Sequence, residues 1–94
     1  MTTGVTAAAA NRAGGDTGQL VLYVREGCHL CDVFLVDLEQ DLASALVAIT
    51  LVDVDSDEAL AMEFGLRVPV LALSGRVVCE GRYESQRVRG ALQV

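Results

Sequence analysis

Lysine and tryptophan are both missing from this 94-residue sequence, and proline occurs only once. The seven basic residues are therefore all arginines, and they stand against 13 acidic residues, which leaves a net charge of −6. An acidic chain without a basic stripe repels phosphate backbones, so we expect no binding to nucleic acid. Only two Tyr and two Phe are present, so aliphatic side chains must fill most of the core.

Long apolar runs are missing as well. No stretch approaches the roughly 20 apolar residues that a membrane-spanning helix needs, so we expect no membrane insertion. The N-terminus also lacks the basic and then apolar segments of a secretory signal. Three cysteines in such a chain point to a reducing compartment, so we expect a cytoplasmic protein with reactive or metal-binding thiols.

The composition divides the chain into a tail and one domain. Residues 1–18 are rich in Thr, Ala, Gly and Asn and show no period of 2 or 3.6 residues, which predicts a flexible tail. Residues 19–94 are expected to form one domain. With 52% apolar residues over the whole chain, the composition is typical of a compact core.

The apolar pattern predicts an α/β domain with the element order β-α-β-α-β-β-α. Strands are expected over 20–24, 46–54, 68–73 and 76–79, and helices over 29–42, from about 56 to 64, and over 85–92. The segment 46–54 is so uniformly apolar that we expect a strand covered on both faces. Asp55 or Ser56 is expected to cap the second helix, and Gly65 to end it. Ser74-Gly75 fits a two-residue hairpin turn.

A pair of cysteines, Cys28 and Cys31, stands between the first predicted strand and the first predicted helix. At a helix start, Cys28 would face unpaired backbone N–H groups and the positive end of the helix dipole, which favour the thiolate. One helical turn brings Cys31 within disulfide reach and buries it more deeply. We therefore expect Cys28 to attack a substrate disulfide and Cys31 to resolve the product. Two inert core cysteines are the alternative interpretation.

The only proline, Pro69, follows Val68 at the start of a predicted strand, where a missing N–H is tolerated. With the Cys28/Cys31 pair, the segment 65–71 and Gly81, it makes residues 20–92 resemble the glutaredoxin-like proteins of the thioredoxin superfamily. The resemblance implies a thioredoxin-like fold, a mixed four-stranded sheet flanked by helices. It also implies a monomeric thiol–disulfide oxidoreductase that acts on protein or glutathione mixed disulfides, with a cellular reductant and no resident cofactor.

The resemblance assigns roles to residues around the cysteines. It implies a cis Val68–Pro69 bond beside them, with the Val68 backbone pairing with a bound peptide or glutathione. Arg25 stands where related proteins often carry a basic residue that contacts glutathione, and its charge would support the thiolate. Gly81 and Glu84 correspond to the element that holds the amino end of glutathione, although Glu80 replaces the first glycine of that element.

Two further residues have open interpretations. As an imidazolium, His29 would stabilise the Cys28 thiolate; as an exposed residue of the first helical turn, it would have little effect. Cys79 is interpreted as a small apolar residue buried in the hairpin, with an intermolecular disulfide as the alternative.

Two other functions compete with thiol–disulfide exchange. Cys28, His29 and Cys31 supply soft ligands for a metal or iron–sulfur module, which a dimer would have to complete because a single chain lacks a convincing fourth ligand. The second is a thioredoxin fold used as a non-catalytic adaptor. The Asp53-x-Asp55-x-Asp57 pattern resembles the start of a calcium loop, but the required Gly and Glu at the sixth and twelfth positions are absent.

Overall fold

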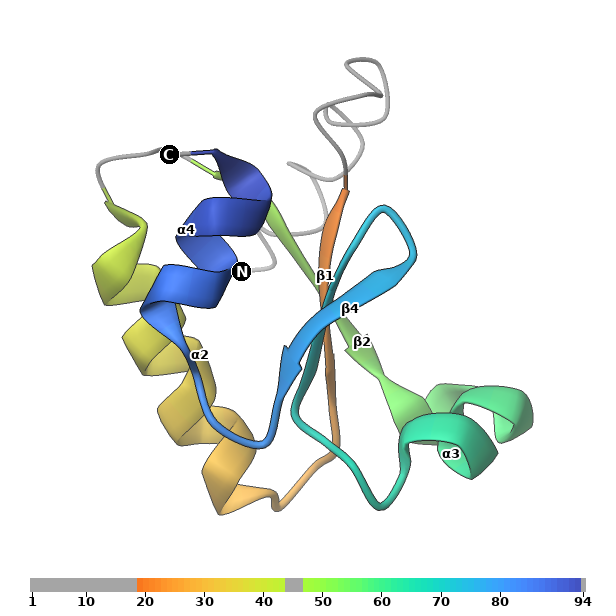
Figure 1. The fold of residues 1–94 in the computed structure, drawn as a ribbon. Coiled ribbons are helices and arrows are strands. Elements are labelled where there is room, and N and C mark those ends of the chain that lie inside the picture. Colours follow the sequence, from red (N-terminus) through yellow and green to blue (C-terminus); the bar gives the residue numbers. More distant parts are fainter. Residues whose placement is uncertain (1–18, 44–46, 94) are drawn as a thin grey trace.

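The computed structural model describes residues 19–43 and 47–93, which form a sheet with helices packed against it (Figure 1). The predicted tail, residues 1–18, lies outside the described residues, as do residues 44–46 and 94 of the predicted domain, including the first residue of the predicted strand 46–54. The elements are β1 (Leu20–Val24), α2 (His29–Asp41), β2 (Ile49–Asp53), the 3-10 turn η3 (Val54–Ser56), α3 (Glu58–Phe64), β3 (Val70–Leu73), β4 (Arg76–Glu80) and α4 (Ser85–Leu92). The predicted order is confirmed, with η3 as an addition.

The four strands form one mixed sheet in the order β2-β1-β3-β4. Strand β1 runs parallel to β2 and antiparallel to β3, and β4 returns antiparallel to β3. The expectation that 46–54 is a strand covered on both faces was wrong. Strand β2 lies at the edge of the sheet, so its residues are half-buried or exposed, with Leu51 among the exposed ones. An apolar run indicates a strand, but it does not fix the position of that strand in the sheet.

The main core lies between the sheet and the two helices α2 and α4. Phe34 and Leu38 of α2 and its C-cap residue Leu42 recur every fourth position on one side of the helix, and all three are buried. This face packs against the strand residues Leu20, Leu22, Leu71 and Cys79, and against Val88 of α4. The rings of Phe34 and Tyr83 pack in a T-shaped arrangement with 5.5 Å between their centroids. The packing fixes the direction of α2, and with it the position of its N-terminus.

The opposite face of the sheet is covered at one end by α3. There Val54, Phe64 and Val70 form a smaller buried cluster, and the rings of Tyr23 and Phe64 stack at 4.6 Å. The predicted cap of this helix was wrong. The side chain of Asp57, not Asp55 or Ser56, accepts hydrogen bonds from the first turn of α3. The buried Val54 holds the chain in the η3 turn first, which moves the helix start along the sequence.

Two glycine-containing turns have different physical causes. Ser74 and Gly75 both have positive φ angles, 52° and 85°, as a two-residue hairpin turn of the primed type requires, so that prediction is confirmed. Gly65 follows the last residue of α3 as expected, but its φ is −54°, in the ordinary helical region. A Cβ at this position would strike the carbonyl oxygen of Ala61 and lie 2.9 Å from a guanidinium nitrogen of Arg25. A close approach, rather than left-handed backbone, therefore requires this glycine.

A polar network joins the end of α2 to α4. The hydroxyl groups of Tyr83 and Ser85 donate to the Asp41 carboxylate at 2.5 and 2.7 Å, and Arg89 donates to the carboxylate at 3.2 Å and to the Asp41 carbonyl oxygen at 2.6 Å. The hydrogen bond from Tyr83, followed by that from Ser85, holds the pKa of Asp41 below its usual range. The ionised form of Asp41 is thus the one that the fold stabilises.

Asp41→Asn is therefore expected to make the stability of the protein less dependent on acid pH. The folded-state pKa lies below the unfolded value of about 4, so ionised Asp41 stabilises the fold above that value, and this contribution is lost as the pH falls through the folded-state pKa. Urea midpoints should differ between wild type and variant at pH 7 and converge towards pH 3. Asp37→Asn, at an exposed position of α2, is the matched control. A wild-type to Asp41→Asn gap that is equal at both pH values would contradict this assignment.

Candidate functional site

The two cysteines of the pair are joined by a disulfide at the start of α2, with their Cα atoms 5.2 Å apart. Cys28 is the N-cap residue of the helix, and its Sγ accepts a hydrogen bond from the Cys31 N–H at 3.1 Å. The N–H groups of Cys31 and Asp32 also approach the Cys28 carbonyl oxygen, at 3.1 and 3.2 Å. The sulfur of Cys28 thus lies among the backbone donors that begin a helix, where a negative charge is stabilised.

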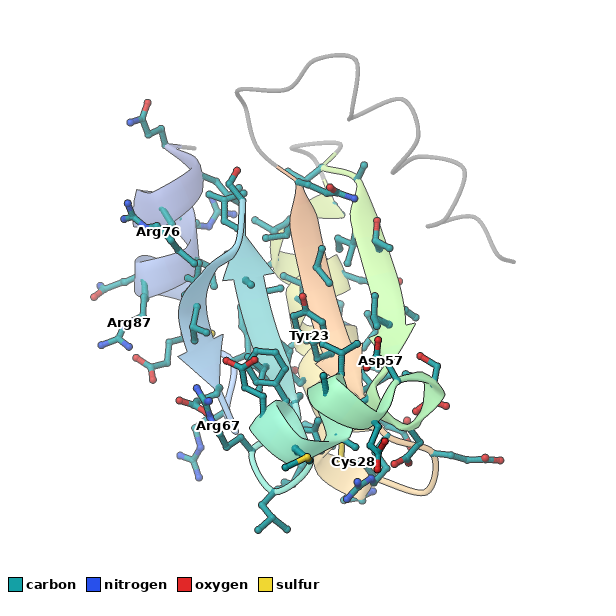
Figure 2. The ribbon with its side chains drawn as sticks, turned by 90° about the vertical axis from the view of Figure 1, so that its right-hand side faces the viewer. Tyr23, Cys28, Asp57, Arg67, Arg76 and Arg87 are labelled. Atoms are coloured by element: carbon teal, nitrogen blue, oxygen red, sulfur yellow. A yellow bond between two sulfur atoms is a disulfide. The ribbon has the colours of Figure 1, made fainter. Side chains whose placement is uncertain are left out.

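The two sulfur positions differ in access. Cys31 is only 3% exposed, whereas Cys28 is half-buried. The turn that presents Cys28 depends on Gly27, whose φ is 79°, and on a hydrogen bond from the Cys28 N–H to the Arg25 carbonyl oxygen at 3.2 Å. Figure 2 shows Cys28 at the lower end of the sheet. A substrate therefore reaches Cys28 more readily than Cys31.

The Val68–Pro69 segment reaches the same end of the sheet. Strand β3 pairs with β1 up to Tyr23 and Val70, so the two residues before Val70 lie beside the turn that follows β1. The Val68–Pro69 peptide bond is cis, Pro69 is buried, and Val68 is half-buried. The Val68 N–H donates to the Phe64 carbonyl oxygen at 3.0 Å, so this N–H already has a partner within the chain.

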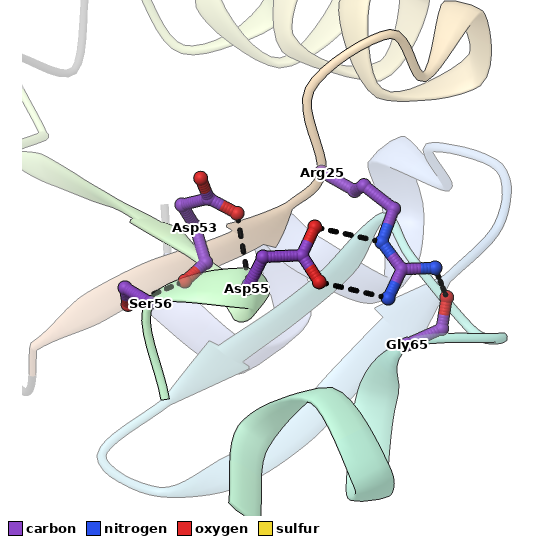
Figure 3. A network of polar contacts seen from close by, with 5 residues as sticks. All are labelled: Arg25, Asp53, Asp55, Ser56 and Gly65. Carbon is purple, nitrogen blue, oxygen red and sulfur yellow. Dashed lines mark hydrogen bonds and ion pairs between the residues drawn. The ribbon is translucent and has the colours of Figure 1, made fainter. Parts of the chain in front are cut away.

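Arg25 has its own acidic partner in the folded chain. Its Nε and Nη2 atoms donate to the two carboxylate oxygens of Asp55 at 3.1 and 3.0 Å, and Nη1 donates to the Gly65 carbonyl oxygen at 3.0 Å (Figure 3). The hydrogen bond and charge of Asp55 raise the pKa of Arg25. The guanidinium thereby ties the turn after β1 to η3 and to the end of α3. Sequence reasoning missed this pair because 30 positions separate its members.

The other predicted site residues are spread around this end and beyond it. Gly81, with φ of 80°, donates its N–H to the Pro69 carbonyl oxygen at 2.8 Å, so the structure brings it against the proline. His29 is exposed at the first position of α2. Glu84 is exposed at the start of α4 and its side chain makes no cap hydrogen bond. Its Oε1 atom lies 3.8 Å from Nε of Arg87. These contacts do not join Glu84 to the cysteine pair.

Cys79 belongs to the core rather than to the site. It is buried in β4 and packs in the cluster between the sheet and the helices, as expected for a small apolar residue. Burial raises the pKa of its thiol, which keeps the reactive thiolate scarce.

Residues 19–43 and 47–93 form neither a metal centre nor a membrane-spanning helix. Within these ranges, no three His, Cys, Asp or Glu side chains gather in a way that could hold a metal ion. No helix of the described chain has the length and apolar character needed to cross a membrane.

Comparisons with known proteins agree with this geometry. Residues 19–93 match a family described as glutaredoxin-like domain (DUF836). Protein XcR50 from X. campestris, whose structure is solved, is 37% identical in sequence to this chain. The match covers 79% of this chain and 95% of XcR50, with a TM-score of 0.62. Protein Ne2328 from Nitrosomonas europaea is 28% identical, with coverages of 78% and 88% and a TM-score of 0.69. No curated protein matches the sequence.

A malarial protein with 15% identity and a TM-score of 0.55 shares the fold alone. The mixed sheet, its helices and the Cys28/Cys31 pair at disulfide distance fit thiol–disulfide chemistry. Because the family match spans nearly the whole described chain, the protein belongs to the glutaredoxin-like domain family (DUF836).

Proposed function

We propose that this protein is a cytoplasmic thiol–disulfide oxidoreductase that acts through Cys28 and Cys31 on protein or glutathione mixed disulfides. One observation carries the proposal. The two cysteines are disulfide-bonded at the N-terminus of α2, and the accessible one is the N-cap residue while the other is buried. This arrangement supplies a stabilised thiolate that substrate can reach, with a second thiol held within reach behind it.

The reaction proceeds by two exchanges. The Cys28 thiolate attacks one sulfur of the substrate disulfide; a Cys28–substrate disulfide forms, and the other substrate sulfur leaves as a thiolate that takes a proton from water. The Cys31 thiol then loses its proton and attacks the Cys28 sulfur, which closes the Cys28–Cys31 disulfide and releases the second substrate sulfur. The substrate gains two electrons and the protein loses two, which a cellular thiol reductant returns.

The neighbouring residues hold the substrate in this proposal. An extended substrate main chain would pair with the carbonyl of Val68, since the Val68 N–H is used within the chain. Gly81, fixed against Pro69, would border the bound segment, with the Glu84 carboxylate available to an amino group further along. His29 would stabilise the Cys28 thiolate when protonated. The Arg25 carbonyl oxygen would position Cys28 by accepting the hydrogen bond from the Cys28 N–H. The Arg25 side chain would hold the turn through its bonds to Asp55 and Gly65. We propose that one chain forms a complete site.

Trapping the first intermediate tests the proposed order of attack. Reduced Cys31→Ser, mixed with a peptide disulfide, is expected to accumulate one peptide adduct at Cys28, because no second thiol is in place to release it. Intact mass and peptide mapping would detect the adduct. Reduced Cys28→Ser should accumulate little, since Cys31 is buried. Equal trapping by the two variants would contradict the order of attack, and no trapping by either would contradict the proposed function.

A further inference from the structure

Two arginines, Arg25 and Arg67, bind carboxylates of the same chain. Arg25 holds both carboxylate oxygens of Asp55 (Figure 3). Arg67, two positions before Pro69, likewise binds both oxygens of Glu80, at 2.7 and 3.3 Å. An anionic substrate that sought either guanidinium would have to displace a carboxylate that is part of the same chain. Such an intramolecular partner competes at a high effective concentration.

Further negative charge surrounds the Arg25–Asp55 pair. Three acidic residues are exposed here: Asp53 at the end of β2, Asp57 at the N-cap of α3 and Glu58 at the start of α3. The protein as a whole carries a net charge of −6. Glutathione has two carboxylates and one ammonium group, so at neutral pH it is an anion. The field at this end of the molecule therefore opposes its approach, and most strongly at low ionic strength.

Exposed apolar side chains lie at the same end. Leu30, between the two cysteines, is 58% exposed, and Leu66 is 99% exposed. Leu66 directly follows Gly65, whose carbonyl oxygen binds Arg25, so it projects from the segment that the Arg25 network holds. A leucine with this exposure gains from contact with an apolar partner, and a small charged tripeptide offers it little apolar surface.

We propose that Asp55 is a specificity-determining residue. By occupying Arg25, it makes the redox face select disulfides carried by uncharged, apolar protein segments over glutathione disulfides. This inference rests on the proposed function and concerns only which disulfide Cys28 attacks. The exchange itself is unchanged, with one S–S bond formed and one broken. Asp55 acts here through Arg25 rather than by touching the reacting sulfurs.

Two substrates and two matched variants test the proposal. Oxidised glutathione is compared with a neutral, end-blocked peptide disulfide that has leucines beside its cysteines, and the oxidation rate of the reduced protein is followed by alkylation and mass. Asp55→Asn is expected to raise the ratio of the glutathione rate to the peptide rate about three- to tenfold at low ionic strength. Asp53→Asn also removes one negative charge, but it leaves the Asp55 carboxylate bound to Arg25. It should therefore change the ratio of the glutathione rate to the peptide rate much less. An equal change in both variants would overturn the assignment to Asp55.

A double variant tests the role of Arg25 directly. If the uncovered guanidinium attracts glutathione, Arg25→Gln combined with Asp55→Asn should abolish the gain. A gain that persists in the double variant would show that Arg25 takes no part. Leu66→Ser should lower the peptide rate and leave the glutathione rate unchanged. A lower rate for both substrates would contradict the proposed contact between Leu66 and apolar substrate segments.

The wild-type protein offers a test that needs no variant to fold. Added salt screens the repulsion, so its rate with oxidised glutathione should rise with ionic strength while the peptide rate stays level. A glutathione rate that falls with salt would mean that an available cation attracts the substrate, and would overturn the inference. A wild-type protein that reacts with neither disulfide would instead contradict the proposed function itself.

Discussion

Replacing Cys28 by serine is expected to reduce turnover of a peptide disulfide by about three orders of magnitude or more, because the attacking thiolate is lost. A serine hydroxyl stays protonated at neutral pH, so the N-terminus of α2 has no anion to stabilise. The Cys31 thiol cannot replace the lost thiolate, because Cys31 is only 3% exposed and a substrate disulfide cannot reach it. The rate would be measured with a dithiol reductant in excess, so that only the protein-dependent steps are compared.

Cys79→Ala is the matched control for this loss. It also removes one cysteine, but from the buried cluster between the sheet and the helices. The variant should keep turnover near the wild-type rate, provided that the measurement is made well below its unfolding temperature. A Cys28→Ser protein that retains a substantial fraction of wild-type turnover would show that the first cysteine is not the nucleophile. Loss of turnover in folded Cys79→Ala would place the third cysteine in the reaction.

Phe34→Ala is expected to lower the free energy of unfolding by about 3–5 kcal/mol, because it deletes a large buried side chain and leaves a cavity. Phe34 is 1% exposed and lies on the face of α2 that packs on the sheet, and its ring forms a T-shaped contact with Tyr83. Small domains are stable by only about 5–15 kcal/mol, so the variant should come close to unfolding. Urea denaturation followed by circular dichroism measures the change.

Val36→Ala on the same helix provides the comparison, because its side chain is exposed. It should change the free energy of unfolding by no more than about 0.5 kcal/mol. A small effect at Phe34, or equal effects at both positions, would contradict the packing of α2 described above. Redox activity depends on this packing as well, because Cys28 is the N-cap residue of α2 and its position follows that of the helix. Phe34→Ala should therefore lose exchange activity at temperatures where it unfolds.

The features that the sequence predicted well rest on local signals. Strand β1 alternates, α2 repeats apolar residues every three to four positions, and Ser74-Gly75 offers the two positive φ angles of the hairpin. The placement of the cysteine pair between β1 and α2 follows from the same short stretch of chain. Each of these features depends on residues within one or two turns of one another, which is the range over which a pattern is informative.

The features that it missed depend on distant partners or on three-dimensional position. The strand β2 is apolar enough to be central but lies at the edge of the sheet. Asp57 rather than Asp55 caps α3 because the buried Val54 first holds the chain in a 3-10 turn. Asp55 meets Arg25 only after the ends of β1 and β2 come together. The sequence predicts that the charge of Arg25 supports the Cys28 thiolate, but it does not reveal that the fold pairs this charge with the Asp55 carboxylate.

A redox titration of the wild-type protein tests the central claim most directly. The protein would be equilibrated in glutathione buffers of stepwise poise, quenched with an alkylating agent, and read by intact mass. We predict that two thiols, mapped to Cys28 and Cys31, disappear together in one two-electron transition while Cys79 remains alkylatable after unfolding. If Cys28 and Cys31 stay reduced at every poise, or if the native mass carries a bound metal, the proposed thiol–disulfide function is contradicted.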